Sequence, residues 1–257
     1  MTHCFAVIIE ILFSVKYGVI LNMITLIQFP KPPTRISFSP FCLKLETYLK
    51  VAKIPYENKL TVSTAKSKKK KLPMILDQGE LIEDSTIIIE HLKEKYHIDL
   101  DQHLSPEQKA IAKSFQWLCE KSIVDIVMYF RWCDPINWPK FREVVFKGAP
   151  WLIKATVANG MASSIRKTLY KHGIGRFSDI EKLKILDDNL EAIGNYLGQK
   201  KYFFGDQVST IDTILFATLV QLEPRDVVAQ FEGVLEKHPL LVKYIENIKK
   251  EYWPELT

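Results

Sequence analysis

The residues most suited to chemistry stand at two predicted helix starts. Ser39 precedes Pro40, the order expected of an N-cap followed by the first helical position. Asp84 and Ser85 precede a second apolar run at helical spacing. Hydroxyls and unpaired backbone amides at a helix N-terminus can hold an anion, because the helix dipole favours negative charge there. The same residues can also serve as helix caps and nothing more, and both interpretations stay open.

The cysteines argue against redox and metal chemistry. The four of them, at positions 4, 42, 119 and 133, form no C-x-x-C pair, so a zinc ribbon or a disulfide scaffold is disfavoured. No metal site is expected, and the usage points to a reducing, cytoplasmic compartment. A dithiol relay would need a cysteine where Ser39 stands. Cys42, inside the same predicted helix, is therefore expected to be a buried, inert thiol.

Composition places the chain among soluble globular proteins, and its positive charge is concentrated. Of its 257 residues 47% are hydrophobic and 25% are charged. The net charge is +5, and most of the surplus is one run, Lys66 followed by Lys68 to Lys71. No basic stripe interleaved with aromatic residues and no known nucleic-acid motif occurs. The run favours a small anionic ligand or a solvated loop, and nucleic acid is not an expected partner.

Residues 5–21 form the most apolar stretch. Glu10 and Lys16 interrupt it, whereas a membrane span needs about 20 mostly uncharged residues. The basic region and the cleavage site of a secretory signal are both missing. Three interpretations stay open: an amphipathic or marginal membrane anchor, an extra helix, or an artefact of start-site choice, since Met23 stands just before the first predicted strand. We expect residues 1–22 to be dispensable for the fold.

The elements that must position the two helix starts follow from the apolar pattern and its breaks. Helices are predicted from 40 to about 53 and from 85 to 96, and strands at 23–29, 56–60, 72–76 and 80–82. Gln78-Gly79 turns the third strand into the fourth. The order β-α-β, loop, β-β-α predicts a compact α/β half.

After Leu100 the strand signals stop. Ser105-Pro106 predicts a cap and a long helix toward Trp132, with further helical segments at 139–147, 150–170, 178–197, 210–222 and 239–251. Ser209 and Asp212 predict a variant capping box, in which Ser209 caps the amide of Asp212 and Asp212 returns a bond to the amide of Ser209. The second half is expected to be all-helical.

An α/β half followed by an all-helical half resembles the glutathione transferase fold, and short motifs match that family in order. Ser39-Pro40-Phe41-Cys42 resembles the start of its first helix, Leu72-Pro73 its third strand and Asp84-Ser85 its γ-glutamyl site. Residues 39–49, 172–177 and 200–202, with Trp253-Pro254, look more closely like the failed axon connections and metaxin-like branch. The resemblance implies a thioredoxin-like domain at 23–100 and a helical domain at 101–257, preceded by an extension at 1–22.

The resemblance also implies a site for glutathione as co-substrate. Ser39 would be the catalytic residue, stabilising the thiolate of glutathione for attack on an electrophile. Leu72 and Pro73 would hold the cysteinyl part, Lys71 the glycyl carboxylate, and Asp84 with Ser85 the γ-glutamyl part. The proline is cis in that fold, and whether Pro73 is cis or trans is left open by the sequence. The partner is then a small-molecule thiol. The electrophile cannot be named, because that pocket is built from variable helices.

The metaxin-like branch implies a different function. The alternative is a non-catalytic interaction or membrane-associated protein, with residues 5–21 as its anchor. Asp84-Ser85 and Leu72-Pro73 favour retained glutathione binding, whereas the long loop before Ser39 favours drift away from it. Whether catalysis is retained and whether the chain forms a homodimer are left open.

Overall fold

The computed structural model describes residues 23–31, 36–148, 150–223 and 227–256. The chain divides into two compact units. Unit 1 comprises the chain up to Lys109 together with Lys201–Ala217 and Glu246–Thr257, and unit 2 comprises Ala110–Lys200 and Thr218–Ile245. The apolar extension at 1–22 lies outside the described residues. Both units are described below within these limits.

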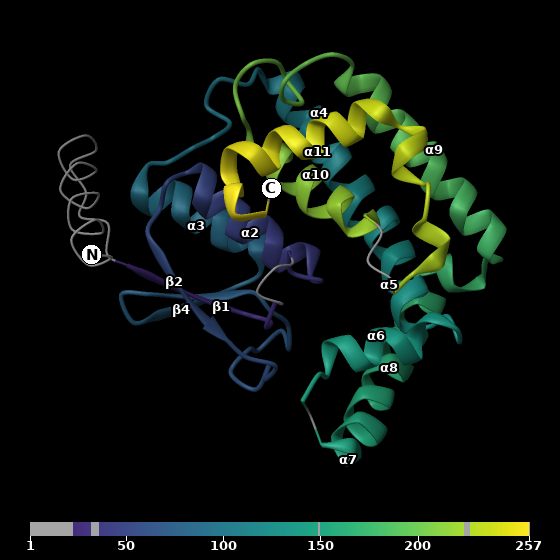
Figure 1. Ribbon diagram of the computed structural model, residues 1–257. Helices are drawn as coiled ribbons and strands as arrows, with labels where there is room; N and C mark the ends of the chain where they lie inside the picture. The colour runs from purple at the N-terminus through teal and green to yellow at the C-terminus, as the bar shows by residue number, and fades with distance from the viewer. Residues whose placement is uncertain (1–22, 32–35, 149, 224–226, 257) are drawn as a thin grey trace. The chain divides into compact units, whose positions relative to one another are not determined.

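Unit 1 is built on a mixed sheet of strand order β2-β1-β3-β4 (Figure 1). β1 (Ile24–Gln28) pairs in parallel with β2 (Tyr56–Leu60) and antiparallel with β3 (Met74–Asp77), which pairs antiparallel with β4 (Glu80–Glu83). This confirms the predicted β-α-β, loop, β-β-α order. β3 begins at Met74 rather than at Leu72, because Pro73 has no amide to give to a strand ladder.

Two helices cover one face of this sheet, α2 (Pro40–Val51) and α3 (Ser85–Tyr96). Their buried side chains share one core with alternate strand residues, including Leu26 and Ile75 from the strands, Leu45 from α2 and Ile88 from α3. The predicted turn is present, with Gln78 and Gly79 both at positive φ, the backbone that joins two strands tightly. The helical spacing of apolar residues in the sequence thus predicted the positions of α2 and α3 correctly.

A buried carboxylate ties α3 to the sheet. Asp77 accepts hydrogen bonds from the Tyr96 hydroxyl at 2.7 Å, from Nε2 of His91 at 2.8 Å and from the Lys95 ammonium at 3.0 Å. The Asp77 side chain is buried, and a buried carboxylate is costly unless its charge is compensated. The three partners, all from α3, provide that compensation. The network fixes the face that α3 presents to β3.

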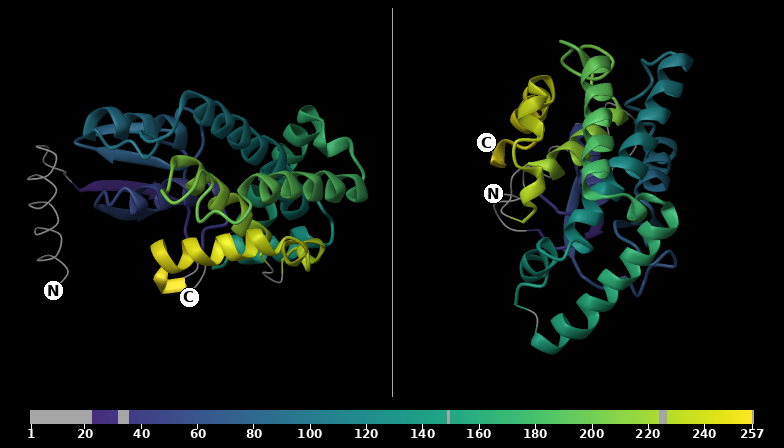
Figure 2. Two further views of the ribbon diagram at one scale, coloured as in Figure 1. Left: turned by 90° about the horizontal axis from the view of Figure 1, so that it is seen from above. Right: turned by 90° about the vertical axis from the view of Figure 1, so that its right-hand side faces the viewer.

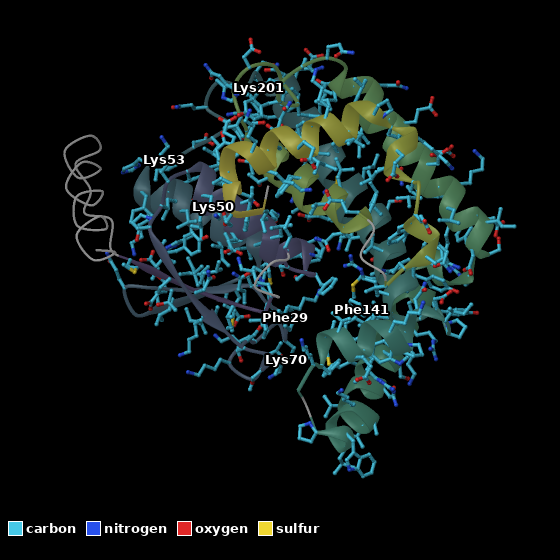
Figure 3. All side chains as sticks on the ribbon, viewed as in Figure 1. Phe29, Lys50, Lys53, Lys70, Phe141 and Lys201 are labelled. Carbon is cyan, nitrogen blue, oxygen red and sulfur yellow. The ribbon has the colours of Figure 1, made fainter. Side chains whose placement is uncertain are left out.

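The C-terminal residues belong to unit 1. Trp253 is buried, and its indole Nε1 donates to the Thr47 hydroxyl of α2 at 3.2 Å. The ammonium of Lys50, labelled in Figure 3, lies 4.2 Å from the centre of the same indole ring and 2.7 Å from a carboxylate oxygen of Glu255. These contacts hold the end of the chain against the C-terminal half of α2.

The start of α10 is fixed by Asp212, which is fully buried in unit 1. The predicted bond from the Ser209 amide to this carboxylate is present at 2.8 Å. The other half of the predicted box is wrong, because the Ser209 hydroxyl donates to Asp212 at 2.7 Å instead of capping its amide. The amide of Asp212 bonds to the carbonyl of Ser209, and the carboxylate also accepts from the amide of Phe203 at 2.8 Å.

The rest of the chain is helical, as predicted. The predicted long helix is α4 (Pro106–Trp117), a π-helical segment η1 (Leu118–Ile123) and α5 (Val124–Trp132) in succession. The remaining elements are α6 (Asn137–Val145), α7 (Trp151–Ile153), η2 (Lys154–Ala158), α8 (Asn159–His172), η3 (Ile174–Arg176), α9 (Asp179–Leu197), α10 (Thr210–Leu219), η4 (Val220–Leu222), η5 (Ala229–Phe231), η6 (Leu235–Lys237), α11 (Pro239–Tyr252) and η7 (Pro254–Leu256) (Figures 1 and 2). Among the described residues, no helix combines the length and the hydropathy that a membrane crossing requires.

Candidate active site

Strand register brings three predicted site segments to one end of the sheet. Met74, at the start of β3, pairs with Ile27 near the end of β1 and with Glu83 at the end of β4. The chain that leads into α2 therefore leaves the sheet at the same end at which Leu72-Pro73 enters it and Asp84 leaves it. Figure 3 labels one residue from each of two of these segments: Phe29, which directly follows β1, and Lys70, which belongs to the lysine run before Leu72.

Side-chain contacts join α2 to the segment before β3 and to the first turn of α3. Leu72, Cys42, Ile27 and Met74 form one buried apolar cluster, which joins α2 to the segment before β3. The buried Lys44 of α2 donates from its ammonium to the Thr86 hydroxyl at 2.9 Å, which joins α2 to the first turn of α3. The N-terminal turns of the two helices are thus held beside the Leu72-Pro73 bond.

Ser39 caps α2. Its backbone is extended (φ −92°, ψ 111°), and its hydroxyl oxygen accepts from the amide of Cys42 at 3.3 Å. Its own amide donates to the hydroxyl of the buried Ser37 at 3.2 Å. Because a hydroxyl that accepts one bond still carries a proton to donate, the cap leaves Ser39 able to donate to an anion. The capping interpretation is thus present in the structure, and the catalytic one stays a prediction.

Cys42 is a buried thiol, as predicted. Burial raises its pKa to about 11, although hydrogen bonds from the Ser39 side chain and the Phe29 backbone act in the opposite direction. The thiol is therefore neutral near pH 7, and it packs against Leu72. This supports the prediction that no dithiol chemistry is carried by this helix.

Asp84 and Ser85 play different parts at the start of α3, which the sequence did not distinguish. The Asp84 carboxylate caps α3, accepting from the amides of Thr86 at 3.0 Å and Ile87 at 3.4 Å. The Ser85 side chain, in contrast, makes no hydrogen bond to any described residue, although Ser85 is only 5% exposed. Asp84 also has a φ of +80°, a backbone conformation that a residue with a side chain rarely adopts and that is typical of functional sites.

The bond between Leu72 and Pro73 is cis, as the resemblance implied. Leu72 is buried, and Lys71 directly before it is exposed. The ammonium groups of Lys66 and of Lys68 to Lys71 form no ion pair with any described residue, and the amide of Lys71 donates to the Ser67 hydroxyl at 3.1 Å. The glycyl-carboxylate role of Lys71 stays a prediction.

Sequence reasoning missed the residue that folds the lysine run. The carboxylate of Glu83 accepts from the amide of Lys68 at 2.8 Å, from the amide of Lys69 at 3.0 Å and from the hydroxyl of the buried Ser67 at 2.9 Å. The amides of Lys69 and Lys68 and the Ser67 hydroxyl hold the pKa of Glu83 below its usual value. The pairing of β3 with β4 could have revealed this contact. It places Glu83, at the end of β4, opposite Met74, and Met74 directly follows the lysine run and Leu72-Pro73.

A second missed feature is a polar network beneath α2. Glu46 is buried and accepts from the Gln28 amide at 3.0 Å, from the Lys31 ammonium at 2.7 Å and from the Tyr56 hydroxyl at 3.1 Å. The apolar spacing of this helix did not reveal that Lys44 and Glu46 are also buried. The hint in the sequence was that Lys44 and Glu46 alternate with Leu43 and Leu45.

The arrangement can bind an extended anionic molecule at two helix starts. The Ser39 hydroxyl lies at the N-terminus of α2 and the Ser85 hydroxyl at the N-terminus of α3, two positions at which the helix dipole favours negative charge. Within the part of the chain that the structure describes, no group of three or more His, Cys, Asp or Glu side chains is placed to hold a metal ion.

Comparison with known proteins finds two family models that match the chain. The model described as "Glutathione S-transferase N-terminal domain" matches residues 40–137, and that described as "Glutathione S-transferase, C-terminal domain" matches residues 186–248. A glutathione S-transferase of Ceriporiopsis subvermispora, solved in complex with glutathione, has the same fold, with a TM-score of 0.62 and 19% identity over 89% of this chain and 97% of that one. The predicted fold is thereby confirmed.

Curated relatives fall into two kinds. Failed axon connections of Drosophila melanogaster is 33% identical over 91% of this chain, which spans only 59% of that protein's length. The isoprene-epoxide–glutathione S-transferase of Rhodococcus sp. is 30% identical over 83% of this chain and 92% of its own length. Human metaxin-2 is 20% identical over 72% of this chain and 71% of its own length. These matches agree with the branch that the sequence motifs resemble.

Proposed function

The chain belongs to the glutathione S-transferase family, and from this premise we propose that it binds glutathione and that Ser39 stabilises the thiolate of the bound tripeptide. The thiolate sulfur attacks an electrophilic carbon and forms a carbon–sulfur bond. The leaving group departs, or the oxygen of an opened epoxide takes up a proton from water. An epoxide is one electrophile to test, because a relative of this chain is named for that activity.

The observation that carries the proposal is the Ser85 side chain. A nearly buried hydroxyl at a helix start, with the capping task already performed by Asp84, is suited to a ligand's carboxylate. On this proposal the γ-glutamyl carboxylate binds at the Ser85 hydroxyl, because the amides of Thr86 and Ile87 already donate to Asp84. The ammonium of the same ligand part lies near the carboxylate of Asp84.

Support for the second half of the site comes from α2. The thiolate would lie at the N-terminus of α2, where the dipole and the Ser39 proton both favour the anion. The backbone beside the cis Leu72-Pro73 bond would hold the cysteinyl part, and Lys71 would pair with the glycyl carboxylate. This assignment gives each of the predicted site residues one contact.

The test for Ser39 must separate catalysis from capping. Ser39→Ala removes both the cap and the proton, whereas Ser39→Asp keeps an acceptor for the Cys42 amide and has no proton to donate. We expect both variants to raise the pKa of bound glutathione toward about 8.5, that of a free thiol. Turnover should fall roughly 10²-fold, as when one preorganised donor is lost.

Ser105→Ala is the matched control, since Ser105 caps α4 by accepting from the amide of Gln108 at 3.2 Å. It should lower stability and leave the thiol pKa and turnover unchanged. Ser85→Ala should weaken glutathione binding more than it lowers turnover at saturation. The measurements are calorimetric titration with glutathione, a thiolate absorbance titration and conjugation rates for several electrophiles.

A second candidate is a non-catalytic interaction or membrane-associated protein of the metaxin type. The observation that favours it is the use of the Ser39 hydroxyl as a helix cap, which would explain a serine there without catalysis. The relatives named Failed axon connections and metaxin-2 point the same way. If the unmutated protein neither binds glutathione nor shows a thiolate signal, the enzyme proposal is wrong and this candidate replaces it.

A further inference from the structure

Unit 2 exposes large apolar side chains where α6 and α8 are joined. We call this surface the α7 tip and define it by Val144, Lys147, Trp151, Leu152 and Val157. Trp151 is 77% exposed, Leu152 56%, Val157 51% and Val144 37%. Single exposed apolar residues are ordinary, but four of them in the segment that joins two helices are more than a scatter of single residues. Figure 1 shows α7 at this end.

The tip is held in place by contacts behind it. The Lys154 ammonium of η2 lies 2.5 Å from a carboxylate oxygen of Glu143 on α6. The Trp138 indole of α6 donates to the side chain of Asn159, the first residue of α8, at 3.2 Å. α7, η2 and α8 follow one another without a break. The apolar side chains therefore protrude from a closed hairpin.

The hairpin also carries a concentrated positive charge. Residues 137–172 contain seven Lys and Arg but one acidic residue, Glu143, and the rest of the chain has 28 Lys and Arg against 29 Asp and Glu. Glu143 is already paired with Lys154. The ammonium groups of Lys140 and Lys147 are exposed and form no ion pair with any described residue. With seven basic residues against one acidic residue, the hairpin has a local net charge of +6.

We propose that the α7 tip docks on the surface of a bilayer that contains anionic lipid. Trp151 and Leu152 enter the boundary between headgroups and acyl chains, and Lys140 and Lys147 meet the lipid phosphates and carboxylates. Exposed tryptophan and leucine flanked by lysines is the combination that binds such interfaces. A second copy of this face is disfavoured, because it would bring two strongly positive surfaces together. The proposal is independent of the glutathione site and of residues 5–21.

A label at the tip tests this directly in the full chain. Leu152→Cys in a Cys4→Ser background carries an environment-sensitive fluorophore, while Cys42, Cys119 and Cys133 are buried. We expect a blue shift and brighter emission with phosphatidylserine-containing vesicles, none with phosphatidylcholine alone, and reversal at high salt. Ile180→Cys, on α9 and 82% exposed, is the matched control and should not respond. The label reads the tip itself, whatever residues 5–21 do.

Charge removal gives a second, quantitative measurement. Lys140→Gln with Lys147→Gln should lower partitioning to the anionic vesicles by roughly 30-fold, from about 1 kcal/mol for each surface lysine. Lys109→Gln with Lys243→Gln, two exposed lysines outside residues 137–172, should leave this partitioning nearly unchanged. A label at 152 that does not respond to anionic vesicles overturns the proposal. So does a response that grows with protein concentration alone, which would assign the tip to a second copy.

Discussion

Asp212 offers the sharpest test of how unit 1 is held together. Its buried carboxylate accepts hydrogen bonds from the amides of Phe203 and Ser209 at 2.8 Å and from the Ser209 hydroxyl at 2.7 Å. A hydrogen bond to a charged group contributes about 1.5–3 kcal/mol, and stranding a buried donor has a cost of its own. Asp212→Ala leaves two buried backbone amides without this acceptor. We therefore expect it to lower the free energy of unfolding by about 3–5 kcal/mol.

The assay is urea unfolding followed by circular dichroism, with hydrogen exchange at individual amides. Asp212→Asn keeps one oxygen but turns an NH₂ group toward another donor, so it should cost about 2 kcal/mol. Asp206→Ala, exposed in the same loop, should stay within about 0.5 kcal/mol of the unmutated chain. Exchange should quicken first at Phe203 and Ser209. An Asp212→Ala protein with an unchanged midpoint would refute the structural role assigned to this carboxylate.

Three further outcomes are expected. Burial raises the pKa of Asp77, but its hydrogen bonds prevail and the pKa is lowered, so its stabilising effect is present above about pH 3.9, the unfolded value, and is lost as the pH falls toward the folded value. The difference in unfolding free energy between the unmutated chain and Asp77→Asn should therefore shrink below about pH 4, which urea titrations from pH 3 to 7 can measure. Cys42 and Cys119, whose pKa values burial raises to about 11 and about 12, should resist iodoacetamide at pH 8 until the chain unfolds, as read by peptide mass spectrometry. Ser39→Ala should lower stability by about 1 kcal/mol through loss of the α2 cap, in a urea melt without any ligand, whereas Ser39→Asp should not.

The sequence predicted the elements better than it predicted their polar contacts. Apolar period and proline breaks depend on neighbours in the chain, which is why β2 and α9 fell within a residue or so of their predicted bounds. The use of Glu83 to fold the lysine run depends on strand register, which no local pattern encodes. The π-helical segment η1 was missed for a similar reason, since its apolar residues differ little from those of an ordinary helix.

The two serine sites differ in what a serine there can tell about function. At Ser39 one hydroxyl oxygen must cap α2 whether or not a thiol is bound, so stability alone can retain the residue. At Ser85 the cap is supplied by the neighbouring carboxylate of Asp84, and no described residue uses the hydroxyl. Replacing Ser85 by alanine should then cost little stability, because the cap and its two amide bonds remain. A loss of glutathione affinity without a loss of stability is consequently a result that the fold alone cannot produce. Ser85, more than Ser39, is the residue at which the ligand-binding and interaction interpretations make opposite predictions.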